Sequence, residues 1–115
     1  IPILSVPRRR IKVRAGEVSI SRVERDPHIE DLAGAAAAAV GLKGPCNVQI
    51  IRASDQTAVI EINPRIGGGL PLSAAAGAPI IEYAILQAIG HDAKSFSTVI
   101  KDGLTMMRYD QSVFV

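Results

Sequence analysis

Two short segments that alternate between apolar and polar residues constrain the fold of this chain more than any other feature. The first segment is residues 47–51, the second is residues 59–63, and a short polar stretch connects them. Alternation with a period of two is typical of β-strands that bury one face, and the short connection favours direct antiparallel pairing. The sequence therefore predicts a β-hairpin.

The apolar residues also predict the register of this hairpin. If residues 54–56 form the loop, one face becomes continuously apolar, whereas a shift by one residue would mix apolar and polar side chains on both faces. In the predicted register Val48 pairs with Ile62, Ile50 pairs with Ile60, and Ala53 pairs with Thr57.

The opposite face of the hairpin then carries oxygen-bearing side chains. Gln49 lies across from Glu61, and Asn47 lies across from Asn63, with Cβ atoms of opposed residues roughly 4.5 to 5.5 Å apart. A carboxylate among side-chain amides, without Cys or His nearby, is a donor set that suits Mg²⁺ or Mn²⁺. The alternative is that these side chains only coat the solvated face of an antiparallel hairpin.

An arginine and three glycines follow the second strand directly. Arg65 offers a planar donor fork to a phosphate or a carboxylate. The triplet Gly67–Gly69 would allow the backbone to approach a ligand closely. Because Mg²⁺ often shares its ligands with substrate phosphates, this combination predicts a nucleotide site.

The tripeptide Asn47–Gln49 and the hexapeptide Ile60–Arg65 together resemble the carboxyl-terminal half of the ATP-grasp domain, in the form found in carbamoyl phosphate synthetase large chains and related ligases. The resemblance is strongest over residues 44–79. It implies that Gln49, Glu61 and Asn63 bind the metal, that Glu61, Asn63 and Arg65 belong to the nucleotide site, and that Arg65 has the catalytic role of reaching the transferred phosphate.

Two further segments are similar to this family but depart from it in detail. Residues 13–19 look like the strand and loop beside the nucleotide, with Arg14 in place of a histidine of the synthetases. Arg14 is therefore a candidate nucleotide contact. The triplet Gly67–Gly69 replaces a serine-rich stretch and looks closer to smaller, single-module ligases of the same superfamily.

The resemblance implies a reaction in which ATP phosphorylates a carboxylate and a nitrogen nucleophile attacks the acyl phosphate. ATP with Mg²⁺ or Mn²⁺ and a carboxylate substrate are the expected cofactors and partners. The chain begins with Ile1 rather than Met, so we expect a fragment that lacks the amino-terminal ATP-grasp lobe and is inactive alone. The alternative function is a non-catalytic binding or assembly module that keeps the half-fold.

The remaining sequence predicts a single α+β domain over residues 1–115, with an antiparallel sheet and helices packed on one face. Asp26 is the expected N-cap of a helix that starts at Pro27 and ends at Gly41. The other expected elements are strands at 1–6 and 9–14, an extended stretch at 17–25, a helical turn at 70–76, a helix at 79–89 and an extended tail at 104–115.

A run of cations, Arg8, Arg10, Lys12 and Arg14, alternates with other residues and would lie on one face of a strand. We weigh three interpretations: a face beside the nucleotide phosphates, an edge strand protected by charge, and a nucleic-acid groove. The groove is disfavoured because the net charge is only +2 and aromatic residues make up 3% of the chain.

The composition bears on the compartment and on assembly. Cys46 is the single cysteine, which excludes an internal disulfide and favours the reducing cytoplasm. No apolar run approaches the roughly 20 residues that span a bilayer, so no membrane partner is expected. An unpaired strand edge predicts self-association of the chain.

Overall fold

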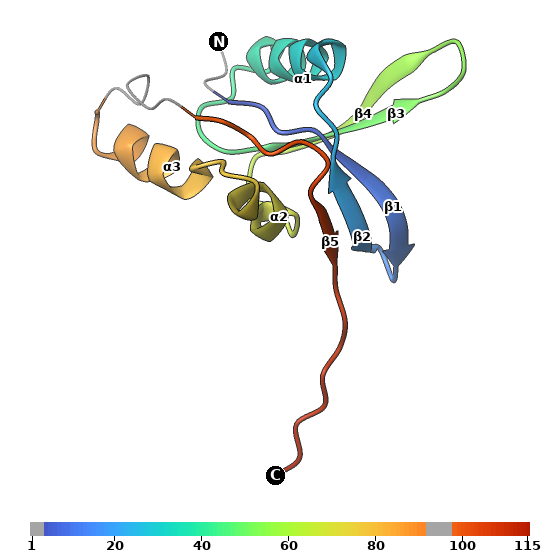
Figure 1. The fold of residues 1–115 in the computed structure, drawn as a ribbon. Coiled ribbons are helices and arrows are strands. Elements are labelled where there is room, and N and C mark those ends of the chain that lie inside the picture. Colours follow the sequence, from blue (N-terminus) through green and yellow to red (C-terminus); the bar gives the residue numbers. More distant parts are fainter. Residues whose placement is uncertain (1–3, 92–97) are drawn as a thin grey trace.

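The computed structural model describes residues 4–91 and 98–115, which form five strands and three helices (Figure 1). A strand was expected at residues 1–6. Residues 1–3 of that range lie outside the described residues. Residues 4–7 have no regular structure, so the prediction is wrong for residues 4–6. The elements are β1 (Arg8–Arg14), β2 (Glu17–Val23), α1 (Pro27–Ala39), β3 (Asn47–Arg52), β4 (Thr57–Asn63), α2 (Leu70–Ala75), α3 (Ile80–Ala88) and β5 (Thr105–Met107).

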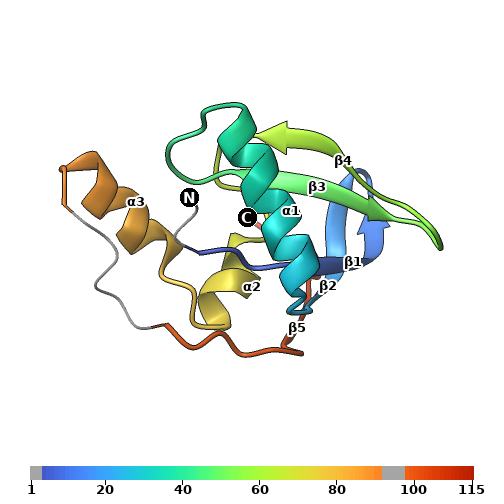
Figure 2. The same cartoon turned by 90° about the horizontal axis from the view of Figure 1, so that it is seen from above.

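The expected α+β class is confirmed, with the antiparallel strands divided between two sheets. One sheet has the order β1-β2-β5, and the other is the hairpin β3-β4. Helix α1 contacts both strands of the hairpin, and Figure 2 shows it lying over them. Helix α2 contacts β2 instead, so each sheet has its own covering helix.

Helix α1 starts and stops where its sequence signals predict. The Asp26 carboxylate accepts hydrogen bonds from the backbone N–H groups of His28 at 2.9 Å and Ile29 at 3.3 Å, and Pro27 occupies the first turn. Gly41 has a φ of +68°, the left-handed conformation that commonly ends a helix. The capped helix packs against both strands of the hairpin, while Ile51 and Ile60 stay more than half exposed.

The predicted register of the hairpin is confirmed at one end and wrong at the other. Asn47, Val48 and Gln49 have the predicted partners, but an irregularity after Gln49 pairs Ile50 with Val59 instead of Ile60. The cause lies in the turn, where the Ala53 N–H donates to the Gln56 carbonyl oxygen at 2.7 Å. This tight closure pairs Thr57 with Arg52 rather than with Ala53, and β4 absorbs the extra residue as a bulge.

A small core joins the three-stranded sheet to α2. Val23 of β2 and Leu72 and Ala76 of the α2 region are buried, and Val6, Ile100, Leu104 and Met106 pack around them. Since α2 begins at Leu70, this core also anchors the end of the glycine triplet.

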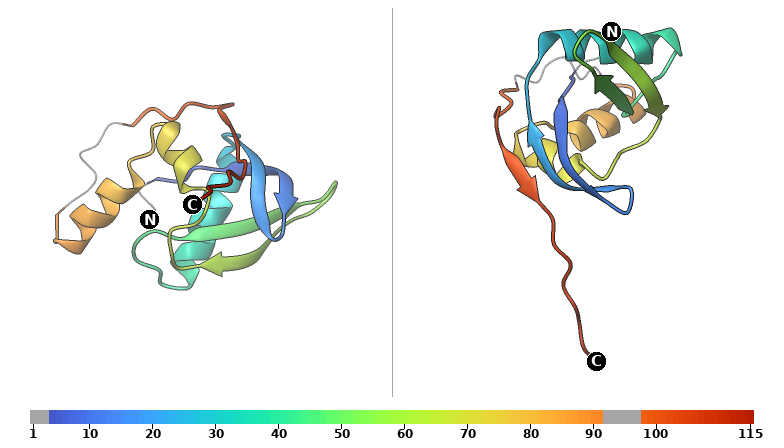
Figure 3. Two further views of the ribbon diagram at one scale, coloured as in Figure 1. Left: turned by 90° about the horizontal axis from the view of Figure 1, so that it is seen from below. Right: turned by 90° about the vertical axis from the view of Figure 1, so that its right-hand side faces the viewer.

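The carboxyl-terminal half contains shorter elements than expected. Helices α2 and α3 lie within the predicted ranges 70–76 and 79–89. In the tail only residues 105–107 form a strand, and the residues after Arg108 leave the sheet without regular structure (Figure 3). No helix in the described part of the chain is long and apolar enough to cross a membrane.

Candidate functional site

The polar face of the hairpin brings the predicted metal ligands together. Gln49 pairs directly with Glu61, and Asn47 pairs with Asn63, two residues away from them on each strand. Residues two apart on a strand share a face, so all four side chains lie on the same side. The Asn63 amide nitrogen donates to the Glu61 carboxylate at 3.0 Å.

The side chains on this polar face suit a metal that completes its coordination with oxygens of a bound nucleotide. Among the described residues no group of three His, Cys, Asp or Glu side chains could hold a metal. Glu61 is exposed and is the one carboxylate of the set. Magnesium commonly binds through one or two carboxylates and completes its coordination with water and phosphates. The residues therefore fit Mg²⁺ accompanied by a nucleotide.

A hydrogen-bonded chain of side chains connects β1 to this face and to the loop after it. The Arg8 guanidinium donates to the Asn47 side-chain oxygen at 3.1 Å and to the Ser73 hydroxyl at 2.6 Å. The Asn47 amide nitrogen donates in turn to the backbone carbonyl of Arg65 at 2.6 Å. Three separate parts of the fold thus meet at Arg8.

Arg8 is the most enclosed arginine of this region. Burial lowers the pKa of Arg8, but an arginine remains charged at neutral pH. Its partner Ser73 is completely buried. A partly buried cation held by a neutral hydroxyl and an amide leaves net positive charge beside the loop.

The glycine triplet makes room for these side chains. A Cβ atom on Gly67 would lie 2.5 Å from the Asn47 side-chain oxygen, and one on Gly69 would lie 2.5 Å from the Arg8 Cζ atom. Gly68 is different, because a Cβ there would lie 3.5 Å from its nearest neighbour, an Arg108 nitrogen. A Cβ at either outer glycine would displace Asn47 or Arg8 from its present position, whereas Gly68 is exposed.

The candidate catalytic residue Arg65 is fixed at its backbone and exposed at its side chain. Its N–H donates to the Asn63 carbonyl oxygen at 2.8 Å, and its own carbonyl accepts from Asn47. The guanidinium donates to the Ile66 carbonyl oxygen at 3.2 Å. This local contact leaves most of its donors available for an anion.

The predicted row of four cations on one face of β1 is wrong. Pairing with β2 is irregular on both sides of Lys12, which interrupts the alternation. Arg8 turns inward, whereas Arg14 is exposed and pairs with Asp110. These two arginines lie at opposite ends of the strand, roughly 20 Å apart. The structure therefore does not bring Arg14 to Asn47 and its neighbours.

The sequence did not predict three residues that lie at the polar face or the glycine triplet. These residues are Arg8 as a buried donor, Ser73 and Arg108. The cationic run pointed to β1 as a whole and not to Arg8 in particular. Ser73 carries no local signal, because its importance depends on the contact with Arg8 across the fold. Arg108 was hidden in the extended tail.

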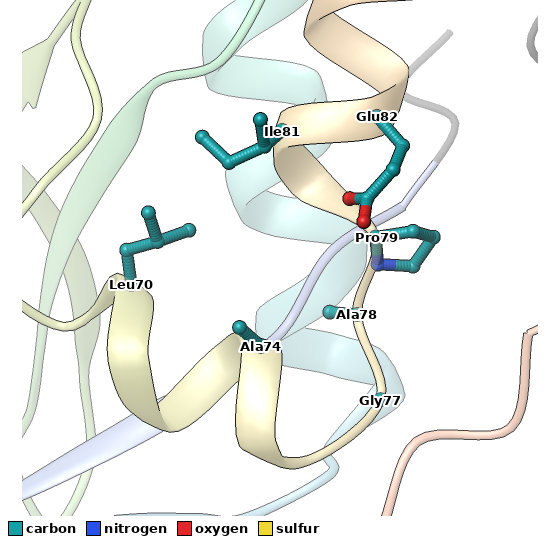
Figure 4. A pocket seen from close by; sticks show the side chains of 7 residues that line it. All are labelled: Leu70, Ala74, Gly77, Ala78, Pro79, Ile81 and Glu82. Atoms are coloured by element: carbon teal, nitrogen blue, oxygen red, sulfur yellow. The ribbon is translucent and has the colours of Figure 1, made fainter.

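A separate hollow of about 260 Å³ lies between α2 and α3. In Figure 4 Leu70 and Ile81 face each other across it, and the Glu82 carboxylate lies near Pro79. Its lining contains no cation. The hollow therefore lacks the charge that a nucleotide would need.

Two comparisons with known proteins found similar sequences. A family described as "ATP-grasp in the biosynthetic pathway with Ter operon" matches residues 2–111. The carbamoyl phosphate synthase large chain of Clostridium perfringens (strain SM101 / Type A) is 43% identical over 74 residues. That alignment covers 62% of this chain and 7% of the relative, so the chain spans only a small part of that protein.

Proposed function

Because the chain belongs to the ATP-grasp family, in the form described for the biosynthetic pathway with the Ter operon, we propose that it is the carboxyl-terminal lobe of an ATP-dependent carboxylate-amine ligase or carbamoyl phosphate synthetase-like enzyme. The observation that carries this proposal is the hairpin register, which places Gln49, Glu61 and Asn63 on one face directly before Arg65. A further lobe would supply the adenine pocket.

The proposed reaction has two steps. An oxygen of the carboxylate substrate attacks the γ-phosphorus of ATP, a new O–P bond forms, the bond to the β–γ bridging oxygen breaks, and ADP leaves. The amine nitrogen then attacks the carbonyl carbon, a C–N bond forms, inorganic phosphate leaves and the nitrogen loses a proton. Both steps proceed without a covalent enzyme nucleophile, so the protein contributes mainly positioning and electrostatic stabilisation.

Each residue of the site has a distinct part in this proposal. Gln49, Glu61 and Asn63 hold Mg²⁺ or Mn²⁺, which when bound neutralises charge on the terminal phosphates. Arg65 donates to the oxygens of the transferred phosphoryl group, and Asn47 fixes the backbone from which Arg65 projects. Arg14 is a proposed nucleotide contact that would have to exchange Asp110 for a phosphate.

Cys46 is a free thiol of intermediate exposure. A reduced cysteine suits the cytoplasm, where glutathione and thioredoxin keep thiols reduced. We therefore place the proposed enzyme there, together with ATP.

The test is Glu61→Gln in the full-length protein, with Glu82→Gln as the control on the exposed face of α3. ADP release is measured against Mg²⁺ concentration across a panel of carboxylates and amines. Removing the carboxylate should lower kcat/KM by about a hundredfold or more, because charge stabilisation in the transition state is lost. The control should retain the activity of the unmodified protein.

Retained turnover in Glu61→Gln would contradict the metal assignment. Arg65→Lys should also lose activity, because a point charge cannot replace a planar donor fork. If the unmodified protein neither binds Mg²⁺ and ATP nor releases ADP, the chain is instead the non-catalytic module.

A further inference from the structure

The Asn47 side-chain amide lies on the polar face of the hairpin, yet both of its ends are engaged by the protein itself. Its oxygen accepts a hydrogen bond from the Arg8 guanidinium at 3.1 Å, and its nitrogen donates to the Arg65 carbonyl oxygen at 2.6 Å. A guanidinium can only donate, and a carbonyl can only accept. One orientation of the amide satisfies both neighbours, because the flipped amide would set donor against donor and acceptor against acceptor.

Arg8 is fixed from the side opposite to this amide. Its guanidinium also donates to the hydroxyl of Ser73 at 2.6 Å, and Ser73 is completely buried in α2. A Cβ atom on Gly69 would lie 2.5 Å from the Arg8 Cζ atom, so the backbone of the triplet lies against the guanidinium. Arg8 is therefore the firmly held donor, and the half-buried Asn47 amide takes its orientation from it.

Asn63, which pairs with Asn47 across the hairpin, uses its amide differently. Its nitrogen donates to the Glu61 carboxylate at 3.0 Å, so its oxygen can bind a cation beside that carboxylate. A cation at the Asn47 oxygen would instead share that oxygen with the Arg8 guanidinium. The two positive charges would repel each other, because an arginine keeps its charge at neutral pH. The geometry therefore suits Asn63 to a metal and Asn47 to another role.

The hydrogen bond from Asn47 holds the backbone carbonyl of Arg65. On the other side of that residue, the Arg65 N–H donates to the Asn63 carbonyl oxygen at 2.8 Å. The peptide groups on both sides of the Arg65 Cα atom are thus held, whereas the side chain of Arg65 is exposed. Because the guanidinium projects from this Cα atom, the orientation of the Asn47 amide limits where the guanidinium can reach.

We propose that Arg8 orients the Asn47 amide, and that Asn47 is a positioning residue for Arg65 rather than a fourth metal ligand. This inference rests on the proposed function, in which Arg65 donates to the transferred phosphoryl group. Phosphoryl transfer depends mainly on the placement of charge, and a displacement of about 1 Å can cost about a hundredfold in rate. Arg8 acts on the reaction through two successive hydrogen bonds and does not touch the phosphate.

The first test is Asn47→Asp in the full-length protein. The new carboxylate still accepts from Arg8, but it cannot donate to the Arg65 carbonyl and repels that oxygen instead. The rate of ADP release is measured against the concentrations of ATP and Mg²⁺. We expect kcat to fall by about tenfold or more, while the half-saturating Mg²⁺ concentration changes by less than about twofold.

A metal ligand at this position would respond in the opposite way, because an added carboxylate strengthens Mg²⁺ binding. A retained kcat or a clearly lower half-saturating Mg²⁺ concentration in Asn47→Asp would overturn the positioning role. The matched control is Gln56→Glu, which makes the same change from amide to carboxylate at the exposed turn of the same hairpin. This control should keep both the kcat and the Mg²⁺ response of the unmodified protein.

The second test replaces Arg8 and needs no ATP. The NMR signals of the Arg65 carbonyl carbon and of the Asn47 side-chain amide are recorded at a temperature where each variant is folded. Arg8→Met should shift both signals, because the amide loses its fixed donor. Arg8→Lys keeps a charged donor, so it should shift them less and retain more of the kcat. Arg10→Met, on the exposed side of β1, should leave both signals unchanged.

The two tests separate this inference from the proposed function. If the unmodified protein releases ADP but the Arg65 carbonyl signal is the same in Arg8→Met, the orienting role of Arg8 is overturned while the proposed function stands. If that signal depends on Arg8 but the unmodified protein releases no ADP, the orienting role stands and the ligase function is refuted.

Discussion

Replacing Arg8 by methionine keeps a long apolar side chain but removes the two hydrogen bonds that join β1 to Ser73 and Asn47. The bond to Ser73 matters most, because this hydroxyl is completely buried and would lose its partner. Hydrogen bonds to a charged group contribute about 1.5 to 3 kcal/mol. Relief of the cost of burying the guanidinium offsets part of the loss, so we expect a net destabilisation of about 2 kcal/mol.

Urea unfolding of Arg8→Met, Ser73→Ala and the double variant forms a thermodynamic cycle. With an m-value of about 1 to 3 kcal/mol/M, the midpoint of Arg8→Met should fall by about 0.7 to 2 M. The double variant should be about 1 kcal/mol more stable than the sum of the two losses predicts. The reason is that each single variant leaves the other residue without its hydrogen-bond partner. Arg10→Met on the exposed side of β1 is the control and should change stability by at most about 0.5 kcal/mol.

A coupling energy indistinguishable from zero would show that Arg8 and Ser73 contribute independently. Arg8→Met with an unchanged midpoint would refute the argument that a buried hydroxyl depends on this guanidinium. Either result would contradict the claim that the hydrogen bonds of Arg8 hold β1 to the region of the glycine triplet.

Three further predictions follow from particular contacts. Gly67→Ala and Gly69→Ala should lower the unfolding midpoint and the rate of ADP release, because each new Cβ would overlap Asn47 or Arg8, whereas Gly68→Ala should leave the midpoint unchanged. The hydrogen bond from Arg52 is the main cause that holds the pKa of Asp26 below its ordinary value, and the backbone N–H groups at the start of α1 lower it further. This stabilisation is present above the unfolded-state pKa of about 3.9 and is lost as the pH falls through the folded-state value, so Asp26→Asn should flatten the acid limb of a thermal melting series; an unchanged limb would exclude Asp26 as its cause. Self-association through the open edge of β1 should increase with salt, which screens repulsion between its cations; a monomer in light scattering at every salt and protein concentration would contradict it.

The sequence predicted the ligand face of the hairpin because that face depends on neighbouring strands. Alternation within each strand decides which side chains share a face, and a one-residue shift would expose the apolar set. The pairing of Gln49 with Glu61 therefore followed from the local pattern. The bulge after Gln49 did not, because it depends on how tightly the turn at 53–56 closes.

The start of α1 was equally predictable from the sequence, because Asp26 caps the helix and Pro27 begins it within a single turn. The glycine triplet was recognised as a place of close approach. Its neighbours at Gly67 and Gly69 were not predictable, because they are side chains from β1 and β3 that arrive by tertiary packing.

The sequence by itself determined the hairpin, its polar face and the capped start of α1, because each depends on contacts between residues close in the chain. Only the tertiary structure decided that Arg8 turns inward to Ser73 and that Arg108 reaches Gly68. The physical reason is the small core of Val23, Leu72 and Ala76, which holds β2 against α2. By joining these elements, the core brings one arginine from β1 and one from directly after β5 to the loop that follows the hairpin.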